Sequence, residues 1–451
     1  MPGRDAGRAR GEGGAHVESR GQRAALSHRT GDTHGRAHAR VLGARGAVER
    51  AAGHGRRARP DPPPREDLIA FRVSSGAVGL VKNACPHRGA SLFYGRNEED
   101  GLRCVYHGWK FDECGTCVDM PSEPAESRFK DKVRAVAYPC VERNGIIWTY
   151  LGRRPTPPPL PDLEPMMTEG ASIQVYQREC NWVQALEGDI DTGHTVFLHL
   201  GHVTPDEVPP GTWARYALGE RAPRYEVVDT EFGVMYGAHR PAEPDSEYWR
   251  IANFLFPFYA MVPTGVLGLE IRVRAWVPMD DEHTLAYTIN LAAPPPNRHV
   301  GRQVVGPVET LPNNSDWYGR FRPVPNQNND YLIDRKEQKE ISYTGISAIF
   351  MQDQAVTESM GPIYDRTEEH LGSSDQMVIR TRKRLIDAAR ALRDRGLVPP
   401  GVDRPEIYGV RSGGVVLPRG ADWLTATQEL RKARVDHPGL SRAVLGNLPA
   451  V

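Results

Sequence analysis

Two short loops, each with one cysteine and one histidine, constrain the fold of this 451-residue chain more than any other part of its sequence. The first loop reads CPHRG and contains Cys85 and His87, and the second reads CVYHGW and contains Cys104 and His107. Sixteen residues separate His87 from Cys104. Since no basic-then-apolar secretion signal precedes the loops, cysteines interleaved with histidines favour a metal site over disulfides.

The pairing within each loop distinguishes between metal centres. Zinc fingers usually pair cysteine with cysteine and histidine with histidine, whereas each loop here offers one thiolate and one imidazole. That mixture suits a Rieske [2Fe–2S] cluster, in which one iron takes two thiolates and the other takes two neutral imidazoles. We therefore expect Cys85, His87, Cys104 and His107 to hold such a cluster, with structural zinc as the alternative.

The remaining cysteines carry less information. Cys114 and Cys117 form a CxxC pair, a spacing that also occurs in redox and zinc sites, but no further partners follow at suitable spacing. We interpret the pair as ordinary cysteines in the segment after the second loop. Cys140 and Cys180 are expected to be small buried hydrophobic residues.

Charge is distributed unevenly although the formal net charge is zero. Residues 1–65 carry a net charge of +8 and residues 66–451 a net charge of −8. An acidic body with aromatic residues spread throughout is not typical of a nucleic-acid-binding protein. The chain also has no apolar run of about 18 residues, so we expect neither a membrane span nor export, and a cytoplasmic location.

Residues 1–65 differ in composition from the rest of the chain. They contain no Phe, Tyr, Trp, Ile, Lys, Asn or Cys, and Arg, Gly and Ala fill 38 of the 65 positions. Such a segment cannot bury enough apolar surface to offset chain entropy. We interpret it as a disordered tail or as coding sequence read in a shifted frame; a basic arm for nucleic acid or anionic lipid is the alternative.

Residues 66–451 divide into regions that differ in composition and in apolar pattern. We expect a small all-β domain over 66–155, a Pro-rich linker over 156–171, a second domain over 172–400 and a C-terminal extension over 401–451. Alternating apolar residues predict strands at 68–73, 77–81, 146–151, 172–178, 248–262, 269–277 and 284–291. Apolar spacing predicts an amphipathic helix over 376–395, a second helix is expected from Asn181, and 294–329 is expected to be a long surface excursion, in the role of a lid.

A second set of metal-binding residue types follows the linker. His194 and His199 lie five residues apart, about 140° around an ideal helix, so they can share one ion only if the helix ends or is distorted between them. Gly193 and the β-branched residues after His194 favour such irregularity. Because an electron-delivering cluster needs an acceptor, we expect a mononuclear iron site of the two-histidine, one-carboxylate type.

At this point the sequence resembles a known family. The segments CPHRGASL, CVYHGWKFD and NWVQALEGDIDTGHTVFLH are similar to the α subunit of Rieske non-haem iron ring-hydroxylating oxygenases, in particular the phthalate 4,5-dioxygenase group. The segments AWVPMDDEHT, NDYLIDR and QDQAVTESMGPIYDRTEEHLGSSD agree with that group. The resemblance spans about residues 66–420. The group normally has an ordered segment before the cluster loops, which residues 1–65 do not resemble.

The resemblance implies roles for individual residues. His194, His199 and Asp353 match the ligands of the mononuclear iron. Asp191 matches the catalytic carboxylate that links an iron-bound histidine to a cluster histidine of the neighbouring subunit. Other nearby carboxylates compete with these two assignments, namely Glu187, Asp189, Glu358 and Asp365.

The resemblance also implies an α+β fold, with an all-β Rieske domain followed by a helix-grip (START/Bet v 1-like) catalytic domain. It implies an aromatic-ring dioxygenase that uses O₂ and electrons from an NAD(P)H-dependent reductase of flavin and ferredoxin type, in a homotrimer or hexamer. A monooxygenase or O-demethylase of aromatic acids, and a pure Rieske electron-transfer protein, are the alternatives. A phthalate-like substrate calls for arginine, and the candidates are Arg221, Arg224, Arg250 and Arg272.

Overall fold

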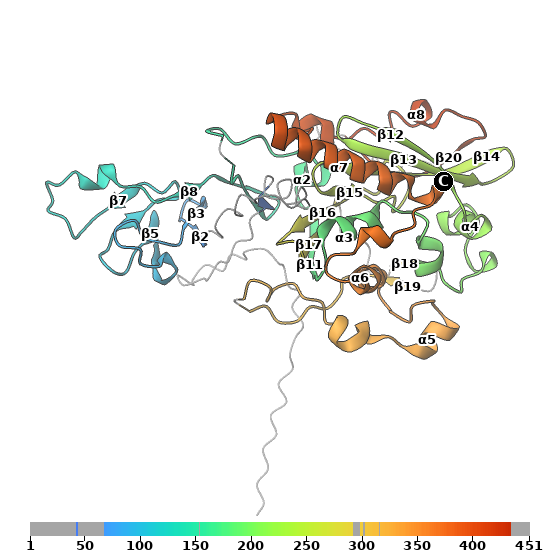
Figure 1. The fold of residues 1–451 in the computed structure, drawn as a ribbon, viewed down its shortest axis with the longest axis horizontal. Helices are drawn as coiled ribbons and strands as arrows, with labels where there is room; N and C mark the ends of the chain where they lie inside the picture. The colour runs from blue at the N-terminus through green and yellow to red at the C-terminus, as the bar shows by residue number, and fades with distance from the viewer. Residues whose placement is uncertain are drawn as a thin grey trace, which may run out of the picture.

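A strand-rich domain and a larger mixed domain lie at opposite ends of the long axis of the chain (Figure 1). The computed structural model describes residues 42–43, 67–152, 154–291, 298–300, 303–314 and 316–433. Apart from the two-residue strand β1 (Leu42–Gly43), the segment 1–65, with its proposed tail or frameshift, lies outside the described residues. The α+β fold class expected from the sequence is confirmed by this arrangement.

Three small sheets build the first domain. Their strand orders are β1-β10-β9, β2-β3-β8 and β4-β5-β6-β7. The strands are β2 (Leu68–Arg72), β3 (Val78–Lys82), β4 (Arg96–Glu98), β5 (Gly101–Arg103), β6 (Lys110–Phe111), β7 (Cys117–Asp119), β8 (Ala137–Tyr138), β9 (Cys140–Arg143) and β10 (Ile146–Thr149). The core between the sheets includes Phe71, Val81, Leu92, Trp109 and Phe111. The predicted strands at 68–73, 77–81 and 146–151 therefore exist, with slightly different ends.

One large antiparallel sheet forms the second domain. Its order is β11-β17-β16-β15-β14-β13-β12, and β20 also pairs with β14. The strands are β11 (Ser172–Arg178), β12 (Arg224–Asp229), β13 (Gly233–Pro241), β14 (Ser246–Leu255), β15 (Tyr259–Met261), β16 (Arg272–Pro278), β17 (Thr284–Asn290) and β20 (Gly413–Pro418). The single strand predicted over 248–262 is wrong in one respect, because residues 256–258 turn the chain and β15 folds back antiparallel to β14.

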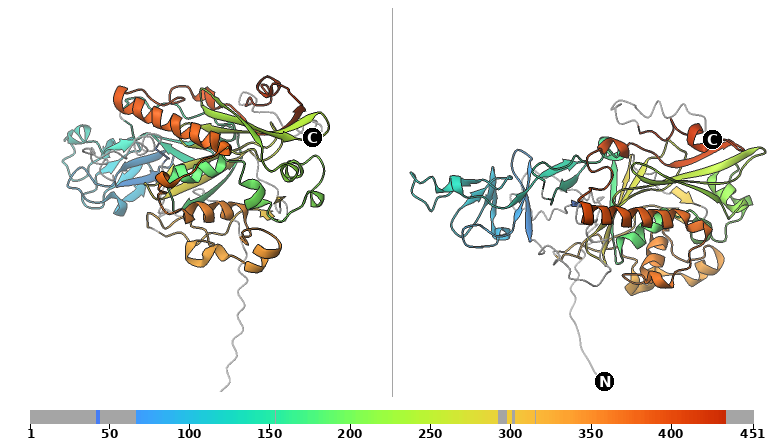
Figure 2. Two further views of the ribbon diagram at one scale, coloured as in Figure 1. Left: turned by 45° about the vertical axis from the view of Figure 1, so that its right-hand side comes forward. Right: turned by 45° about the horizontal axis from the view of Figure 1, so that its top comes forward.

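Helices pack on this sheet and on one another. They are α2 (Glu164–Met167), α3 (Trp182–Asp189), α4 (Trp213–Gly219), α5 (Arg335–Glu340), α6 (Ile349–Ser359), α7 (Gln376–Arg395) and α8 (Trp423–Ala426). The longest helix, α7, matches its predicted bounds and lies along the sheet, in contact with β12 and β13 (Figure 2). Its buried residues, which include Met377, Val378 and Leu385, face the sheet because they recur at helical spacing.

The segments expected to be linker, excursion and C-terminal extension all contact the second domain. The linker contains α2. Leu163, which precedes α2, and Met166 within it are buried in the main core. The excursion contains the hairpin of β18 (Arg298–Val300) and β19 (Gln303–Val305), and the Val308 N–H donates to Tyr176 Oη at 2.7 Å. Its role as a lid stays a prediction. From the C-terminal extension, β20 enters the sheet beside β14.

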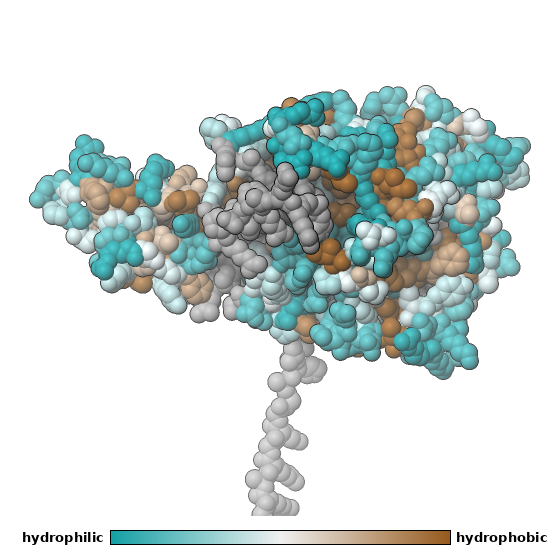
Figure 3. All heavy atoms as spheres, viewed as in Figure 1, coloured by the Kyte–Doolittle hydropathy of each residue, from teal (hydrophilic) through white to brown (hydrophobic). Residues whose placement is uncertain are grey.

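The surface seen in Figure 3 is mostly hydrophilic, with smaller hydrophobic patches between the polar residues. Within the described residues, none of the helices combines the length and the apolar character needed to cross a bilayer.

Candidate active site

The two cluster loops have the same backbone conformation. In each loop the N–H of a glycine donates to the carbonyl of the cysteine four residues earlier, from Gly89 to Cys85 at 2.8 Å and from Gly108 to Cys104 at 3.0 Å. Both glycines have left-handed φ angles, +76° and +79°, which L residues with a Cβ rarely adopt. The first loop follows β3 and the second follows β5, so the two sheets carry two equivalent turns.

The four side chains of these loops form two pairs with different surroundings. The thiols of Cys85 and Cys104 are buried neighbours, and burial together with the adjacent thiol raises the pKa of Cys85 to about 11. The rings of His87 and His107 are half-exposed, with centroids 4.4 Å apart. Burial, followed by the nearby charges of His87 and Arg88, lowers the pKa of His107, which favours the neutral imidazole.

This arrangement fits a two-iron cluster better than a single zinc ion. A tetrahedral zinc site would bring all four donor atoms together around one ion. Among the described residues, only one group of three His, Cys, Asp or Glu side chains converges on one ion-sized point. That group lies in the second domain, and none of its members is in these loops. A buried pair of sulfurs beside an outer pair of imidazoles is the donor set that the two irons of a Rieske cluster require.

All six cysteines are free, and the four outside the cluster loops have different environments. Cys114 is exposed on the turn between β6 and β7, whereas Cys117 is buried and its thiol faces the Asp119 carbonyl at 3.5 Å. Cys180 is fully buried, in agreement with its expected role as a small apolar residue, while Cys140 is only half-buried.

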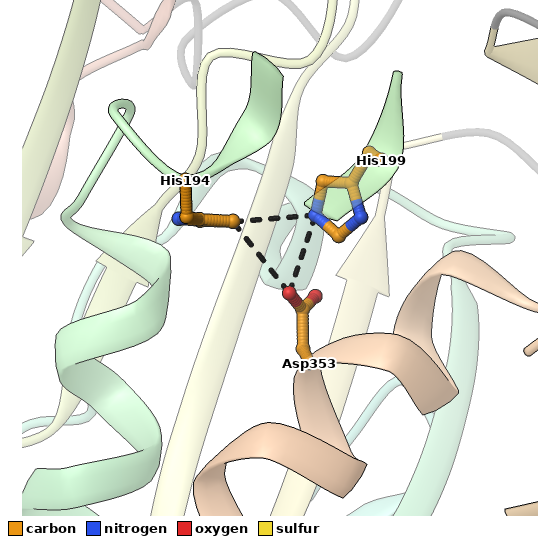
Figure 4. A group of neighbouring side chains, drawn as sticks. All are labelled: His194, His199 and Asp353. Atoms are coloured by element: carbon orange, nitrogen blue, oxygen red, sulfur yellow. Dashed lines mark hydrogen bonds and ion pairs between the residues drawn. The ribbon is translucent and has the colours of Figure 1, made fainter. Parts of the chain in front are cut away.

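The second set of residues meets at one point in the larger domain (Figure 4). The Nε2 atoms of His194 and His199 are 3.2 Å apart, and Asp353 Oδ1 lies 3.5 Å from the first and 3.2 Å from the second. Neighbouring ligands each about 2.1 Å from one ion would be about 3 Å apart. The three side chains therefore have the spacing of a facial metal triad, and the structure brings together the three residues named from the sequence.

A break in helical structure allows the two histidines to converge. Helix α3 ends at Asp189, and Thr195–His199 form a single π-helical turn in which the Leu200 N–H donates to the Thr195 carbonyl, five residues back. This wider turn confirms the irregularity expected from the 140° argument. Asp353 arrives from α6, whose backbone is bound to α3: the side-chain amide of Gln184 on α3 donates to the Thr357 carbonyl of α6 at 2.7 Å.

Neighbouring groups set the protonation and orientation of the triad. Burial raises the pKa of Asp353, but the two imidazoles and Arg178 outweigh it and hold that pKa far below its usual range. Asp191 Oδ2 lies 3.1 Å from His194 Nδ1, and Asp191 Oδ1 accepts the Gly193 N–H at 2.6 Å. The Asp191 side chain remains partly exposed, so one of its edges is accessible from outside the chain.

The competing carboxylates have other partners. Glu187 pairs with Arg382 and Arg366, Asp189 accepts from Arg274 and Trp276, Glu358 accepts from Tyr331 and Gln354, and Asp365 caps a short 3₁₀ helix through the Thr367 N–H. None of the four belongs to the group that converges on the ion-sized point among the described residues. The geometry thus favours Asp353 beside the histidines and Asp191 behind His194.

A buried arginine near this site was not predicted from the sequence. Arg240 on β13 is 1% exposed, and Nε, Nη1 and Nη2 have no hydrogen-bond partner among the described residues. Burial, followed by repulsion from Arg250, lowers the pKa of Arg240 to about 10. Because directly paired residues of antiparallel strands share a face, Arg240, Tyr248, Arg250 and Tyr236 point to the same side of the sheet.

Two tyrosines connect this arginine cluster to the triad. Tyr225 and Tyr236 have buried hydroxyl groups without hydrogen-bond partners in the described part of the chain. Burial raises the pKa of each tyrosine, and the Asp191 charge adds to the shift. Tyr225 Oη would lie 3.6 Å from a Cβ built on Gly193. Unsatisfied buried donors of this kind call for a polar ligand.

The four arginines proposed from the sequence have different environments. Arg250 is buried beside Arg240, with its guanidinium 4.7 Å from the ring centre of Trp213. Arg221 and Arg224 are exposed, and Arg272 donates to Asn290 Oδ1 at 2.7 Å. Of the four, Arg250 alone lies in the cluster with Arg240.

Comparisons with known proteins find a matching family for each of the two domains. Residues 61–139 match the family described as Rieske [2Fe-2S] domain, and residues 149–441 match the family described as LigXa C-terminal domain like. The chain is 46% identical to a 3-chlorobenzoate-3,4-dioxygenase oxygenase subunit of Comamonas testosteroni, over 81% of this chain and 87% of the relative.

Two further relatives show the range of reactions among similar chains. A phthalate 4,5-dioxygenase oxygenase subunit of Pseudomonas putida is 38% identical over 72% of this chain and 75% of the relative. A tert-butanol monooxygenase / tert-amyl alcohol desaturase oxygenase subunit of Aquincola tertiaricarbonis is 30% identical over 79% of this chain and 73% of the relative.

Proposed function

We propose that this chain, which belongs to the Rieske non-haem iron aromatic ring-hydroxylating oxygenases as an α (oxygenase) subunit, hydroxylates the ring of a carboxylated aromatic substrate. The chain is an oxidoreductase, and its cofactors are a Rieske [2Fe–2S] cluster and a mononuclear iron. When bound, these groups supply the electron storage and the activation of O₂, because side chains alone carry out neither. The electrons come from an NAD(P)H-dependent reductase, and we place the enzyme in the cytoplasm, where that cofactor is available.

The ligand sets that we propose follow from the donor geometry. Cys85, His87, Cys104 and His107 hold the cluster, because two buried thiols lie beside two half-exposed imidazoles. His194, His199 and Asp353 hold the iron, because their donor atoms lie 3.2–3.5 Å from one another. A facial triad occupies one side of the ion and leaves the opposite side for substrate and O₂.

Asp191 is the catalytic residue beyond the ligands. Its carboxylate accepts the Nδ1–H of His194 and orients that ring. The partly exposed edge of Asp191 is free to accept the N–H of a second imidazole. Within one chain the cluster loops, which adjoin β3 and β5, lie far from α6 in Figure 1. We therefore propose that the second imidazole is a cluster histidine of a neighbouring copy, which makes the active unit a cyclic homotrimer or a hexamer of two trimers.

The Arg240–Arg250 cluster supports an aromatic acid as substrate. A buried guanidinium without partners is costly unless an anion pairs with it, and a carboxylate matches its planar donors. The charges of the two arginines and of Asp191 all act on Tyr225 and Tyr236, so the tyrosines adjoin both groups. A carboxylate bound at the arginines would therefore direct the rest of the ring toward the triad. This orphaned guanidinium is the observation on which the substrate proposal depends.

The experiment is turnover by the chain with its reductase on benzoate- and phthalate-type acids, with the corresponding methyl esters as neutral controls. Arg240→Met should raise KM for the acids about 10- to 100-fold, since a hydrogen bond to a charged group contributes about 1.5–3 kcal/mol. Turnover of the esters should change little. The exposed Arg224→Met is the matched control.

Three results would contradict the proposal. One is equal KM values for Arg240→Met and Arg224→Met with every acid tested. Another is product formation by His194→Ala at the wild-type rate. The third concerns the type of reaction: incorporation of one atom of ¹⁸O₂, with loss of an O-alkyl group, would replace dioxygenation by the monooxygenase or O-demethylase alternative.

A further inference from the structure

The two iron-site histidines have different groups behind them. The Nδ1 of His194 faces the Asp191 carboxylate at 3.1 Å, whereas the Nδ1 of His199 faces the side-chain amide of Gln352 at 2.8 Å. Gln352 is fully buried, and His199 is 6% exposed. This amide therefore shares a closed space with the ring of His199, away from bulk water.

The orientation of the Gln352 amide follows from its other contact. Its Nε2 lies 2.8 Å from the Ile346 carbonyl oxygen, and a carbonyl can only accept a hydrogen bond. The NH₂ group must therefore face Ile346, and Oε1 must face His199. Because Oε1 in turn can only accept, the Nδ1 of His199 carries the proton and donates it. The lone pair of the ring is then on Nε2, the atom that points to Asp353 Oδ1 at 3.2 Å.

We propose that Gln352 is a positioning residue that fixes the tautomer and ring orientation of His199 for metal binding. The inference rests on the iron ligand set of the proposed function. Gln352 and Asp353 are adjacent on α6, so one short piece of helix supplies a ligand atom and also holds the ring of another ligand. Partners of this kind affect metal affinity about 10- to 100-fold when removed.

The surroundings of Gln352 fix its place. Gln354, two residues later on α6, makes separate contacts: its amide donates to the Gln177 carbonyl at 3.1 Å and to Glu358 Oε1 at 2.7 Å. Ile346 precedes α6, and its side chain packs in a small apolar cluster with Met351. Rotation of the amide would break both hydrogen bonds in a dry interior and leave buried polar groups unsatisfied, which is unfavourable.

The neutral amide also sets the charge near the site. Asp191 and Asp353 already place two carboxylates against the histidines. A glutamine behind His199 accepts the hydrogen bond from its Nδ1–H without adding a third carboxylate. Gln352→Glu keeps an acceptor at this place and should preserve the ring orientation, whereas Gln352→Met keeps length and helix propensity but removes the acceptor.

The test measures Fe(II) binding, not turnover. Full-length protein with an intact cluster is stripped of its mononuclear iron and titrated anaerobically with Fe(II), and the nitric oxide complex is examined by EPR. Gln352→Met should weaken Fe(II) binding about 10- to 100-fold, and Gln352→Glu should stay within about threefold of wild type. Gln354 is a buried glutamine on the same helix, and its amide donates to Gln177 and Glu358. Gln354→Met is therefore the matched control, and its Fe(II) affinity should also stay within about threefold of wild type.

The outcomes separate this inference from the proposed function. Wild-type affinity in Gln352→Met, or an equal loss in Gln354→Met, would overturn the role of Gln352 while leaving the ligand set intact. Equal Fe(II) binding by wild type and His194→Ala would contradict the ligand set and, with it, this inference. If Gln352→Met does not fold, Gln352→Leu repeats the measurement with a different apolar shape, and a loss rescued by Gln352→Glu supports the proposal.

Discussion

The buried ion pair between Arg411 and Glu164 predicts a large loss of stability when one partner is removed. Arg411 Nε donates to Glu164 Oε2 at 2.6 Å, Nη2 donates to Oε1, and Nη1 donates to the Gly268 carbonyl at 3.1 Å. Both side chains are 5% exposed, and the pair joins α2 of the linker to the segment before β20. Arg411→Met therefore leaves the Glu164 carboxylate buried without this cation.

The magnitude follows from the burial. Removing one partner of a buried ion pair costs about 3–5 kcal/mol. A domain of about 250 residues has an unfolding entropy near 0.5 kcal/mol/K at its midpoint, so Tm should fall by about 6–10 °C. The exposed pair Arg404–Glu231 gives the matched control, and Arg404→Met should shift Tm by about 2 °C or less.

Calorimetry of the single variants and of the Arg411→Met/Glu164→Leu double variant tests this reasoning. The double variant should be more stable than the sum of the two single losses predicts, because neither member of the pair then remains buried without the other. A Tm of Arg411→Met within 2 °C of wild type, or strict additivity in the double variant, would refute it.

Three further predictions concern other parts of the chain. The hydrogen bond from Arg382 lowers the pKa of Glu369, so this carboxylate stabilises the fold at pH 7 and loses its contribution as pH falls from its unfolded pKa of about 4.3 through its lowered folded pKa. Glu369→Gln should therefore lower the urea midpoint more at pH 7 than at pH 3, and an equal shift at both would contradict this. A Cβ at Gly193 would lie 3.1 Å from Asp191 Oδ1, so Gly193→Ala should slow cluster reoxidation in single-turnover kinetics while iron content stays unchanged, and an unchanged rate would argue against Asp191. Because Cys114 is exposed and outside the loops, Cys114→Ser should keep the acid-labile sulfide and the EPR signal of the cluster, whose loss would make this thiol a ligand.

The sequence predicted best where local pattern and structure coincide. The apolar spacing of residues 376–395 gave the bounds of α7, and the alternation over 172–178 gave those of β11. The spacing of His194 and His199 even required a break in the helix, which the π-helical turn provides.

The parts of the fold and of the site that the sequence patterns did not predict depend on contacts between distant segments. Helix α6 was not predicted because Gln352, Gln354, Thr357 and Glu358 are buried polar residues that disrupt its apolar periodicity. Asp353 was named through the resemblance alone. Arg240 could not be distinguished from a surface arginine, since its burial results from the pairing of β13 with β14 and the tyrosines that this pairing brings to one face.

The π-helical turn between the two histidines makes the iron centre depend on the number of residues in the chain. Val196 is fully buried and Phe197 is 52% exposed, so the residues inside the turn have little in common beyond their count. Deleting one of them would leave the histidines four residues apart, a spacing that places two side chains on one face of a regular α-helix without a wider turn. During divergence of such chains, the five-residue spacing and the wider turn therefore have to change together, and Val196, which packs in a core cluster with Leu200 and Val203, is restricted to apolar residues of similar size.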